Sequence, residues 1–579
     1  MSLILCLTEI ERESCHNNAY EDGLSCNVRQ AGCFVESRKD FIYKYIVNGL
    51  FSMNEHKILI LLALLSFMCS GVVMAETHRI IPAVQEMQVG RGALLLNSSV
   101  TVSYVAELEN EATLLAKYLD EDFNIHLEKS VDIEGVIDLC IDTDFQSNSK
   151  EGYELVVSDE KVKITSSTAV GVFYGIQTLR QLIVKDKEHL SIPEVYIKDY
   201  PAFSWRAFML DEARAFKGKE VVFLLLDEMA RLKMNVFHWH LTDDQGWRIE
   251  IKKYLRLTEI GAWRDSTQIG GYRGATYDGK RHGGFYTQEE IKEVVAYAAE
   301  RHIMIIPEFE MPGHESAAIA AYPWLGTTGR QIDVPCRFGV QYEVMDVTSS
   351  RVQGFIEDVL DEIITIFPSP VIHIGGDEVK FDQWNASTSI QEYMIRQGIE
   401  TPADLQIVFT NRISHLLQQK ERRMMGWNDI TGNKIHEYNT EADATAKEKL
   451  ADGTIVQFWK GDLDLIEKTA SQGYDIVNSY HYKTYLDYDY QKIPLEKAYE
   501  FDPVPEGLPE DLKKKILGLG CQMWGEEIMD NDKMYYQIFP RIAAYAECGW
   551  TLPGRKDYFS FLKPLEKLKI VWRTQGLMK

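Results

Sequence analysis

The amino-acid sequence predicts a (β/α)8 barrel preceded by a small α/β domain, and three observations support this fold class. From residue 200 onward, eight short apolar segments alternate with segments whose apolar residues have helical spacing. Polar and aromatic residues follow each apolar segment, as in barrels whose active site lies at the carboxyl ends of the strands. The chain has 579 residues, which is too long for one ordinary core and suits two or three domains.

The front of the chain carries the pattern of an export signal. The apolar run Ile58–Met68 contains 11 residues, which is short for a membrane span and typical of a signal-peptide core. Small residues that suit a signal peptidase end at Ala75. We therefore expect residues 1–52 to be an extension upstream of the native start and residues 53–75 to be a signal peptide. A buried core helix is the alternative for this isolated run.

This interpretation has consequences for localisation. We expect no membrane span, and we expect the protein to be exported to the periplasm, the cell surface or the medium. Cys69 allows lipid attachment as an alternative to simple cleavage, although Ser66-Phe67-Met68 is a poor sequence to precede a lipidated cysteine. A lipid anchor would hold the protein at a membrane surface, whereas cleavage at Ala75 would release it.

Residues 76–199 are predicted to form the small α/β domain. Strands with alternating apolar residues are expected to begin near Gly92, Ser99, Tyr153, Val162 and Val195. Apolar residues have helical spacing in 109–118 and 169–184. No combination of residues in this part of the chain indicates catalysis, so we expect an accessory role in packing.

Residues 200–579 are predicted to hold the barrel and a C-terminal helix. The eight strands are expected to begin near Phe208, Val236, Ile303, Val371, Met424, Ile455, Ile476 and Ile516. Helices are expected at 220–234, 289–301 and 402–419, the second after a Thr287-x-x-Glu290 capping box and the third after Thr401-Pro402. An open, doubly wound sheet is the alternative, but no glycine-rich phosphate loop follows the first strand.

The stretch Val371–Val379 is the most informative part of the predicted barrel. The β-branched residues around His373 predict a short buried strand, and two glycines let the backbone turn after it. Asp377 and Glu378 then stand side by side at the end of this strand. Burial of two adjacent acids costs free energy unless a ligand or a reaction uses both charges. A solvated acid pair is the alternative, and the glycines and the buried strand argue against it.

Composition excludes several classes of partner. The formal net charge of −25 argues against a nucleic-acid partner, which needs a basic surface. The nine cysteines contain no Cys-x-x-Cys pair, so neither a zinc site nor a disulfide framework is indicated. His238, His240 and His314 leave a metal site as an alternative, but histidines at alternate strand positions also occur as packed barrel residues. We expect no cofactor and no metal.

Each predicted strand is followed by residues that suit a carbohydrate. In chain order these are Asp211 to Arg214, His238 to Arg248, Glu308 to His314, Asp377-Glu378, Trp427 to Asp429, Trp459, Tyr485 to Asp487, and Trp524 to Glu526. Aromatic rings stack on the apolar faces of sugars, while Asp, Glu and Arg bind sugar hydroxyls. Paired carboxylates are the usual groups that cleave glycosidic bonds. The expected partner is therefore a glycan.

Six motifs between residues 200 and 550 identify a family. They are Trp205 to Asp211, Phe237 to Arg248, Met311 to His314, His373 to Glu378, Tyr485 to Asp487, and Trp524-x-Glu526. In type and order they resemble the motifs of the family 20 glycoside hydrolases, the β-N-acetylhexosaminidases, and the small front domain resembles that family's usual companion. One departure is Glu310, where the family more often has Asp.

The resemblance implies an exo-acting hydrolase that releases terminal N-acetylglucosamine or N-acetylgalactosamine with retention of configuration. Adjacent acids cannot flank one bond from opposite faces, and in this family the substrate's own 2-acetamido group is the nucleophile, which gives an oxazoline intermediate. Glu378 would be the general acid and then the base, a role that favours a pKa raised towards neutrality by dry, acidic surroundings. Asp377 would hold the acetamido nitrogen, and Tyr485 would donate to the acetamido oxygen.

The resemblance also implies supporting and binding residues. His314 would support Glu378, together with either Asp243 or Asp244, and spacing alone leaves this choice open. Trp427, Trp459 and Trp524 would form the walls of the pocket. Arg206, Asp487 and Glu526 would bind the ring hydroxyls.

Two other functions remain as alternatives. One is a glycan-binding protein that has kept the pocket and lost catalysis, and such a protein should lack the acid. The other is a sugar-cleaving barrel with a carboxylate nucleophile, which would form a covalent bond to the sugar and would not need an acetamido group. The sequence does not distinguish N-acetylglucosamine from N-acetylgalactosamine, and it fixes neither the linkage nor the oligomeric state.

Overall fold

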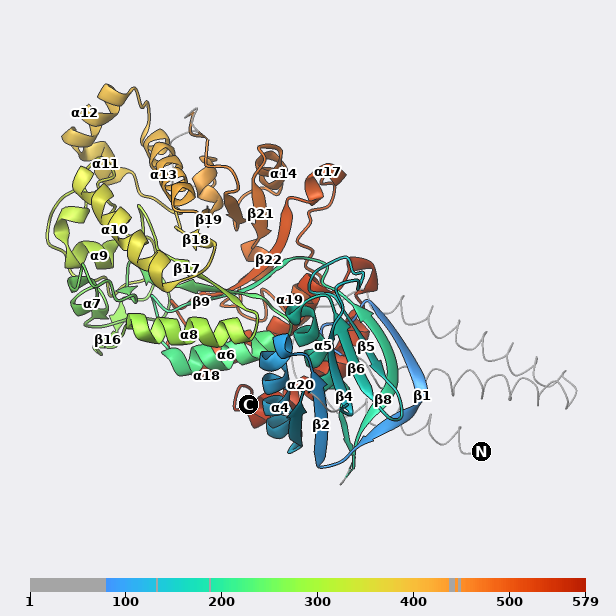
Figure 1. The fold of residues 1–579 in the computed structure, drawn as a ribbon. Helices are drawn as coiled ribbons and strands as arrows, with labels where there is room; N and C mark the ends of the chain where they lie inside the picture. The colour runs from blue at the N-terminus through green and yellow to red at the C-terminus, as the bar shows by residue number, and fades with distance from the viewer. Residues whose placement is uncertain (1–79, 132–133, 187–188, 437–442, 446–448) are drawn as a thin grey trace, which may run out of the picture. The chain divides into compact units, whose positions relative to one another are not determined.

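The computed structural model describes residues 80–131, 134–186, 189–436, 443–445 and 449–579 (Figure 1). The predicted upstream extension and signal peptide therefore lie outside the described residues. Residues 78–579 form one compact unit. Among the helices of the described part of the chain, none is long and apolar enough to cross a membrane.

The small domain is a mixed sheet with two helices. Its strands are β1 (Glu86–Leu96), β2 (Ser99–Tyr104), β3 (His126–Ser130), β4 (Ile137–Ile141), β5 (Tyr153–Val157), β6 (Val162–Ser166), β7 (Val184–Asp186) and β8 (His189–Asp199). They pair in the order β1-β8-β5-β6-β4-β2-β3, and β7 pairs with β8. The helices are α4 (Glu109–Phe123) and α5 (Ala169–Leu182), and the 3₁₀ turn η1 (Ala106–Leu108) precedes α4. The five expected strands are present as β1, β2, β5, β6 and β8, whereas the sequence pattern does not predict β3, β4 and β7.

The large domain is a closed barrel of parallel strands, which confirms the predicted fold class. The barrel strands are β9 (Trp205–Asp211), β10 (Val236–His240), β17 (Met304–Glu308), β18 (Val371–His373), β19 (Arg423–Trp427), β20 (Ile455–Phe458), β21 (Asp475–Asn478) and β22 (Ile516–Met523). Each strand pairs with its successor along the chain, and β22 closes the barrel on β9. Every residue of β9 and β10 is buried, as expected when helices cover the outside and side chains fill the inside. All eight predicted strand positions are confirmed.

Helices surround the barrel and extend to the C-terminus (Figure 1). They are α6 (Lys219–Arg231), α7 (Arg256–Glu259), α8 (Gln288–Glu300), α9 (Ser316–Ala321), α10 (Ser350–Ile366), α11 (Asp382–Ala386), α12 (Thr388–Gln397), α13 (Pro402–Gln419), α14 (Asp464–Ser471), α15 (His481–Thr484), α16 (Leu495–Tyr499), α17 (Glu510–Lys513), α18 (Asn531–Ile538), α19 (Arg541–Trp550) and α20 (Tyr558–Thr574). Short 3₁₀ turns are η2 (Pro323–Leu325), η3 (Asn428–Thr431) and η4 (Pro553–Arg555). Two-residue strands occupy the loops after β10, namely β11 (Thr242–Asp243), β12 (Gly246–Trp247), β13 (Trp263–Arg264), β14 (Gln268–Ile269), β15 (Thr276–Tyr277) and β16 (His282–Gly283).

The predicted helix starts agree with the capping geometry. The Thr287 hydroxyl accepts a hydrogen bond from the Glu290 backbone N–H at 3.2 Å, and the Glu290 carboxylate accepts the Thr287 N–H at 3.0 Å. This reciprocal capping box opens α8. Helix α13 has the predicted bounds and begins with Pro402 at its first position, where a missing N–H costs nothing.

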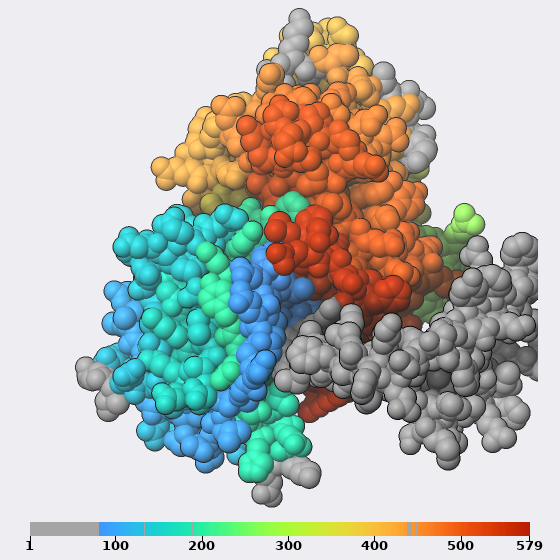
Figure 2. Space-filling model, turned by 90° about the vertical axis from the view of Figure 1, so that its right-hand side faces the viewer, coloured from blue at the N-terminus to red at the C-terminus, as the bar shows by residue number. Residues whose placement is uncertain are grey.

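The small domain packs on the end of the barrel where the strands begin, through buried polar contacts. Lys233, just before β10, places its ammonium 2.9 Å from the Tyr153 hydroxyl and 3.0 Å from the Asp199 carboxylate. The Trp550 indole N–H donates to the same carboxylate at 3.0 Å. Figure 2 shows the small domain, in blue to teal, beside the red C-terminal part of the chain. Because every one of these groups is paired, we interpret this interface as a rigid structural contact, and we call it the joint.

Candidate active site

A cavity of about 360 Å³ opens where the barrel strands end, within the usual range of small-molecule sites. Its lining residues come from loops that follow seven of the eight strands, and they are Arg214, Asp243, Tyr272, His314, Gly339, Val340, Asp377, Glu378, Trp459, Tyr485, Asp487, Tyr488, Trp524 and Glu526. Nine of the twelve predicted site residues are in this set. Asp244 lies directly behind it, while Trp427 and Arg206 need separate comment.

The backbone after β18 is bent so that two acids face the cavity. Gly375 and Gly376 have φ values of 62° and 86°, and Glu378 has a φ of 52°. A side chain at Gly375 would also clash with Glu310, because its Cβ would lie 1.6 Å from Glu310 Oε2. A non-glycine residue at positive φ is strained, and such residues are enriched at active sites. The turn therefore holds the backbone of Glu378 in a strained conformation that places its side chain at the cavity.

His314 connects the acid to a pair of aspartates. Its Nε2 lies 3.6 Å from Glu378 Oε2, and its Nδ1 lies 3.1 Å from Asp244 Oδ2 and 3.3 Å from Asp243 Oδ1. Asp244 also accepts the hydroxyl and the backbone N–H of Ser316 at 2.5 and 3.1 Å, so it is fixed as a partner of the imidazole. Asp243 is shared with Arg214, whose guanidinium lies 2.7 Å away. Both aspartates thus contact His314, and Asp244 is the more dedicated of the two.

Charges around the two acids move their pKa values in opposite directions. Burial raises the pKa of Asp377 to about 8, and the neighbouring Asp429 and Glu378 carboxylates add to this effect. Burial also opposes ionisation of Glu378, but contact with His314 and the charges of His314 and His436 bring its pKa below the usual value. The expectation of a raised pKa for Glu378 is therefore wrong. Two imidazoles face this acid, and the raised pKa belongs to its neighbour.

Aromatic rings form the walls of the cavity. The rings of Trp459 and Tyr485 are nearly parallel, with an interplanar angle of 8° and centroids 6.4 Å apart. Trp524 lies 5.9 Å from Tyr485. Trp427 is not among the lining residues: it is buried, its ring centroid lies 6.4 Å from that of Trp459 and 5.7 Å from that of Trp524, and its indole N–H donates to Glu308 at 2.8 Å. Its predicted role as a wall is corrected to support of the two tryptophans that do form the wall.

One part of the cavity is rich in polar groups. Glu526 accepts hydrogen bonds from the Tyr272 hydroxyl and, at 3.3 Å, from the Gly339 backbone N–H. Asp487 is buried, and burial raises its pKa to about 8. Among the described residues, Asp487 Oδ1 and Asp377 Oδ1 have no hydrogen-bond partner although both atoms are buried. Buried oxygens of this kind are expected to be satisfied by a ligand or by water.

Arg206 is the predicted site residue that the structure places elsewhere. It is the second residue of β9, near the start of the strand, and it is fully buried. Its guanidinium lies 2.8 Å from Glu151 of the small domain and donates to the Lys233 carbonyl at 2.8 Å. Residues near the start of a barrel strand lie away from the active-site end. The arginine of the cavity is instead Arg214, which follows β9 and lies over the Trp524 ring with its guanidinium carbon 5.2 Å from the ring centroid.

The histidines of β10 serve a buried carboxylate. Glu308 lies 2.9 Å from His238 Nε2 and 2.9 Å from His373 Nδ1, and it also contacts His240 Nδ1. Among them, His238, Glu308 and His373 come close enough to surround an ion. The oxygens of Glu308 are, however, already engaged by imidazole and indole nitrogens, so an ion would have to displace them. The cluster instead holds the Trp427 indole through Glu308, and it holds Asp243 through His240, whose Nε2 lies 3.0 Å from Asp243 Oδ2.

Tyr272 and His436 are site residues that the sequence patterns do not identify, and Arg214 is noted after the first strand but is given no role. Arg206, within the motif Trp205 to Asp211, takes the role of the binding arginine instead. Tyr272 and His436 lie in long loops, far from the ends of strands β10 and β19 that they serve. Position relative to a strand end is a signal that could have identified Arg214, whereas the other two depend on how the loops fold back.

Comparison with known proteins agrees with this geometry. Sequence models described as "Glycosyl hydrolase family 20, catalytic domain" and "Glycosyl hydrolase family 20, domain 2" match residues 203–553 and 77–200. A β-hexosaminidase of Porphyromonas gingivalis is 35% identical over 86% of this chain and 64% of its own length, and one of Vibrio furnissii is 37% identical over 69% and 65%. The chain thus matches slightly less than two thirds of the length of these relatives.

Solved structures give the same result. The structure of a Vibrio harveyi exo β-N-acetylglucosaminidase in complex with N-acetylglucosamine has 31% identity and a TM-score of 0.75, covering 86% of this chain and 78% of that chain. A Streptomyces plicatus N-acetyl-β-hexosaminidase has 27% identity and a TM-score of 0.73, covering 86% and 96%. The family model spans more than half of the chain and coincides with the barrel that carries the cavity. This chain therefore belongs to glycosyl hydrolase family 20.

Proposed function

We propose that this protein is an exo-acting β-N-acetylhexosaminidase, which hydrolyses terminal non-reducing N-acetylglucosamine or N-acetylgalactosamine from glycans with retention of configuration. The observation that carries the proposal is the arrangement of Asp377 beside Glu378. Glu378 is partly exposed in the cavity, and Asp377 presents a buried oxygen that has no partner among the described residues. An amide N–H of an N-acetyl sugar would satisfy that oxygen.

The proposed reaction has two steps. In the first, Glu378 gives its proton to the glycosidic oxygen, the bond from that oxygen to the anomeric carbon breaks, and the acetamido oxygen forms a bond to the same carbon. Asp377 accepts the acetamido N–H and stabilises the positive charge of the oxazolinium ring, while Tyr485 donates to the acetamido oxygen. In the second step, the Glu378 carboxylate takes a proton from water, and the water oxygen forms a bond to the anomeric carbon. The bond from that carbon to the acetamido oxygen breaks, which opens the oxazoline ring and restores the acetamido group.

The polar part of the cavity supports removal of sugars from a chain end. Tyr272 and Gly339 hold Glu526 against the cavity, so the site is built around a defined carboxylate there. Asp487, Glu526 and Arg214 are suited to bind the hydroxyls of one ring, while aromatic rings cover its faces. The similar V. harveyi protein is an exo-acting enzyme whose structure contains bound N-acetylglucosamine, which favours the same mode here.

A comparison of substrates tests this proposal. We expect the protein to cleave an aryl N-acetyl-β-glucosaminide and to leave the matching glucoside intact, because the glucoside lacks the nucleophile. Cleavage of both substrates would favour a carboxylate nucleophile, and binding without cleavage of either would favour a glycan-binding protein. Profiling the sugars released from defined oligosaccharides would establish the preferred hexosamine and the linkage.

The intermediate provides a second test. A thiazoline analogue of N-acetylglucosamine resembles the oxazoline and should bind at least ~10²-fold more tightly than substrate. Asp377→Asn should weaken both turnover and thiazoline binding, because the developing cation favours the carboxylate form of Asp377 and asparagine cannot carry that charge. A fluorosugar that traps covalent intermediates should label no carboxylate. Mass spectrometry of a stable glycosyl adduct on any Asp or Glu would contradict the mechanism.

Export is part of the proposal and rests on the sequence alone. The apolar run Ile58–Met68 and the small residues before Glu76 support a mature chain that begins near Glu76 or at a lipidated Cys69. Mass spectrometry of the protein from its native host would separate these two starts by mass. A native protein that begins at Met1 would contradict both.

A further inference from the structure

We propose that Asp429 and His436 form a second carboxylate–imidazole pair that acts on Glu378, with His436 as a positioning residue that stabilises the ionised acid. This inference rests on the hydrolysis proposed above and extends it to a pair of residues outside the predicted machinery. The pair reaches Glu378 from η3 and the segment after it, whereas His314 reaches it from the loop after β17.

Asp429 contacts the acid, the histidine and a pocket wall at once. Its Oδ1 accepts the backbone N–H of Glu378 at 3.2 Å and the His436 Nε2–H at 2.6 Å. Its Oδ2 accepts the Trp459 indole N–H at 2.9 Å. One buried carboxylate therefore fixes the strained backbone of the acid, the imidazole beside it and the ring that lines the sugar cavity.

The two histidines face different oxygens of the acid. His436 Nδ1 lies 3.9 Å from Glu378 Oε1, while His314 Nε2 lies 3.6 Å from Glu378 Oε2. Each imidazole turns its other nitrogen to an aspartate, which orients the ring and favours its protonated form. Both rings are almost fully buried, so water screens their charges poorly. The acid thus has a matched imidazole on each side.

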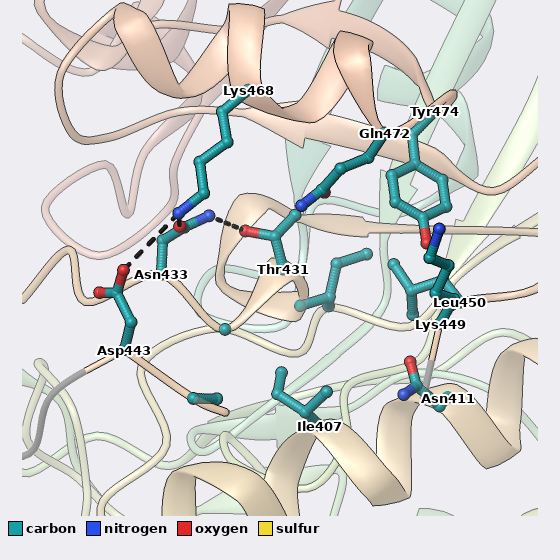
Figure 3. Close-up of a pocket in the computed structure, with 13 residues that line it drawn as sticks. Ile407, Asn411, Thr431, Asn433, Asp443, Lys449, Leu450, Lys468, Gln472 and Tyr474 are labelled. Atoms are coloured by element: carbon teal, nitrogen blue, oxygen red, sulfur yellow. Dashed lines mark hydrogen bonds and ion pairs between the residues drawn. The ribbon is translucent and has the colours of Figure 1, made fainter. Parts of the chain in front are cut away.

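Side-chain contacts anchor the segment between Asp429 and His436, and Figure 3 shows those of Asn433 with Thr431 and Lys468. The Asn433 side-chain N–H donates to the Thr431 hydroxyl at 2.6 Å, and the Lys468 ammonium of α14 donates to the Asn433 carbonyl oxygen. Lys468 also lies 3.6 Å from Asp443. The Thr431 hydroxyl in turn donates to the Asn428 carbonyl at 2.7 Å. This chain of contacts limits the movement of the turn that carries His436.

The charged groups around His436 favour its cationic form. Burial acts against the charge, but Asp429 first and Glu378 second raise the pKa of His436 above its usual value. Lys460 faces the ring from the loop after β20, with its ammonium 3.5 Å from Nδ1, and opposes this effect. A cationic His436 favours the carboxylate form of Glu378, as His314 does.

This arrangement suits the second half of the reaction. After the proton has left Glu378, the carboxylate must persist until it takes a proton from water. Two imidazolium groups, one facing each oxygen, stabilise that carboxylate, and of the two only His314 also lines the cavity. His436 therefore acts through Glu378, and its contribution should appear in the pH dependence of the reaction.

His436→Gln tests the proposal, because glutamine keeps polarity and cannot carry the positive charge. With a disaccharide substrate, kcat/KM falls as Glu378 ionises, and loss of the cation should raise the pKa that this limb reports. We expect the limb to move to higher pH by about one unit. With a dinitrophenyl glycoside, whose leaving group needs little protonation, the shift should be small. His415→Gln, on the exposed face of α13, is the matched control and should leave the profile unchanged.

Lys468→Met provides a second variant, in which His436 itself is not substituted. By releasing Asn433 it should move the same limb in the same direction by a smaller amount, even if His436→Gln does not fold. A His436→Gln protein with wild-type melting temperature and an unmoved limb, or with an equal loss of activity at every pH, would overturn the proposal. Activity of the wild-type protein on the N-acetylglucosaminide is measured alongside, so failure of the proposed hydrolysis is distinguished from failure of the role given to His436.

Discussion

The barrel buries charged side chains at both ends, and the two ends differ in how their carboxylates are paired. Where the strands begin, Lys233 contacts Tyr153 and Asp199, and Arg206 contacts Glu151. Where the strands end, the buried oxygens Asp377 Oδ1 and Asp487 Oδ1 have no partner in the described part of the chain. Paired carboxylates mark a structural joint, and unpaired ones mark a site that a ligand completes.

The two ends also differ in how individual carboxylates are held. At the joint, Asp199 is held by an ammonium, a phenol hydroxyl and an indole N–H. At the cavity, burial raises the pKa of Asp377 and that of Asp487 to about 8 each. Acids that remain difficult to ionise in a cavity are candidates for chemistry, whereas a well-paired acid contributes to folding. A substitution at the cavity such as Glu378→Gln should therefore mainly lower activity, and a substitution at the joint such as Lys233→Met should mainly lower stability.

Glu378→Gln should produce the largest effect on activity. General acid–base assistance contributes ~10²–10⁴-fold, so turnover of a natural disaccharide should fall by about that factor. The melting temperature should change little, because Glu378 is partly exposed. Glu293→Gln, at an exposed position on α8, is the control for an ordinary loss of charge. Near wild-type turnover of the disaccharide by Glu378→Gln would remove this residue from the mechanism.

Lys233→Met should produce the largest effect on stability. It leaves Asp199 as a buried charge without its cation, which typically costs about 3–5 kcal/mol of unfolding free energy. Urea denaturation measures this loss, and kcat of the folded fraction should be unchanged because Lys233 does not line the cavity. Lys219→Met breaks a more exposed pair with Glu293, whose atoms are 2.8 Å apart, and should cost only ~0–1 kcal/mol. Equal losses in the two variants would contradict the distinction between joint and surface.

Asp487→Asn should produce an effect on stability that depends on pH. The pKa of Asp487 is about 8 in the folded protein and about 3.9 in an unfolded chain. Its contribution to stability is therefore fully present below about pH 4 and is lost as the pH rises through about 8. Asparagine does not titrate, so the melting temperature of the variant relative to wild type should increase between pH 4 and pH 8. Calorimetry at several pH values measures this trend. Asp452→Asn, at an exposed position, should show no such trend, and a flat difference for Asp487→Asn would contradict the assignment.

Much of the barrel could be predicted because local patterns and fold rules agree. Buried strands such as Val236–His240 are followed by polar residues, and closure of a barrel brings all strand ends together. The pair Asp377 and Glu378 and the pair Tyr485 and Asp487 could thus be placed in one cavity, although the two pairs are far apart in sequence. The capping residues of α13 fixed its start for a similarly local reason.

Other features could not be predicted because they depend on contacts between distant loops. Arg206 and Arg214 differ by eight positions along one strand and its loop, and only the packing of the small domain shows that the first belongs to the joint. The lowered pKa of Glu378 depends on His314 and His436, which lie on separate segments. A sequence contains charges without the distances between them, and electrostatic interactions depend on those distances and on burial.

The sequence alone therefore determined the barrel, the order of its strands and the identity of the acid pair, since periodicity, turns and motif order are local properties. The tertiary structure decided which arginine faces the cavity, which aspartate serves His314 most closely, and that a second imidazole faces Glu378. These features arise where loops from different strands meet, and their chemistry is set by a few ångströms of separation in a buried, poorly screened environment.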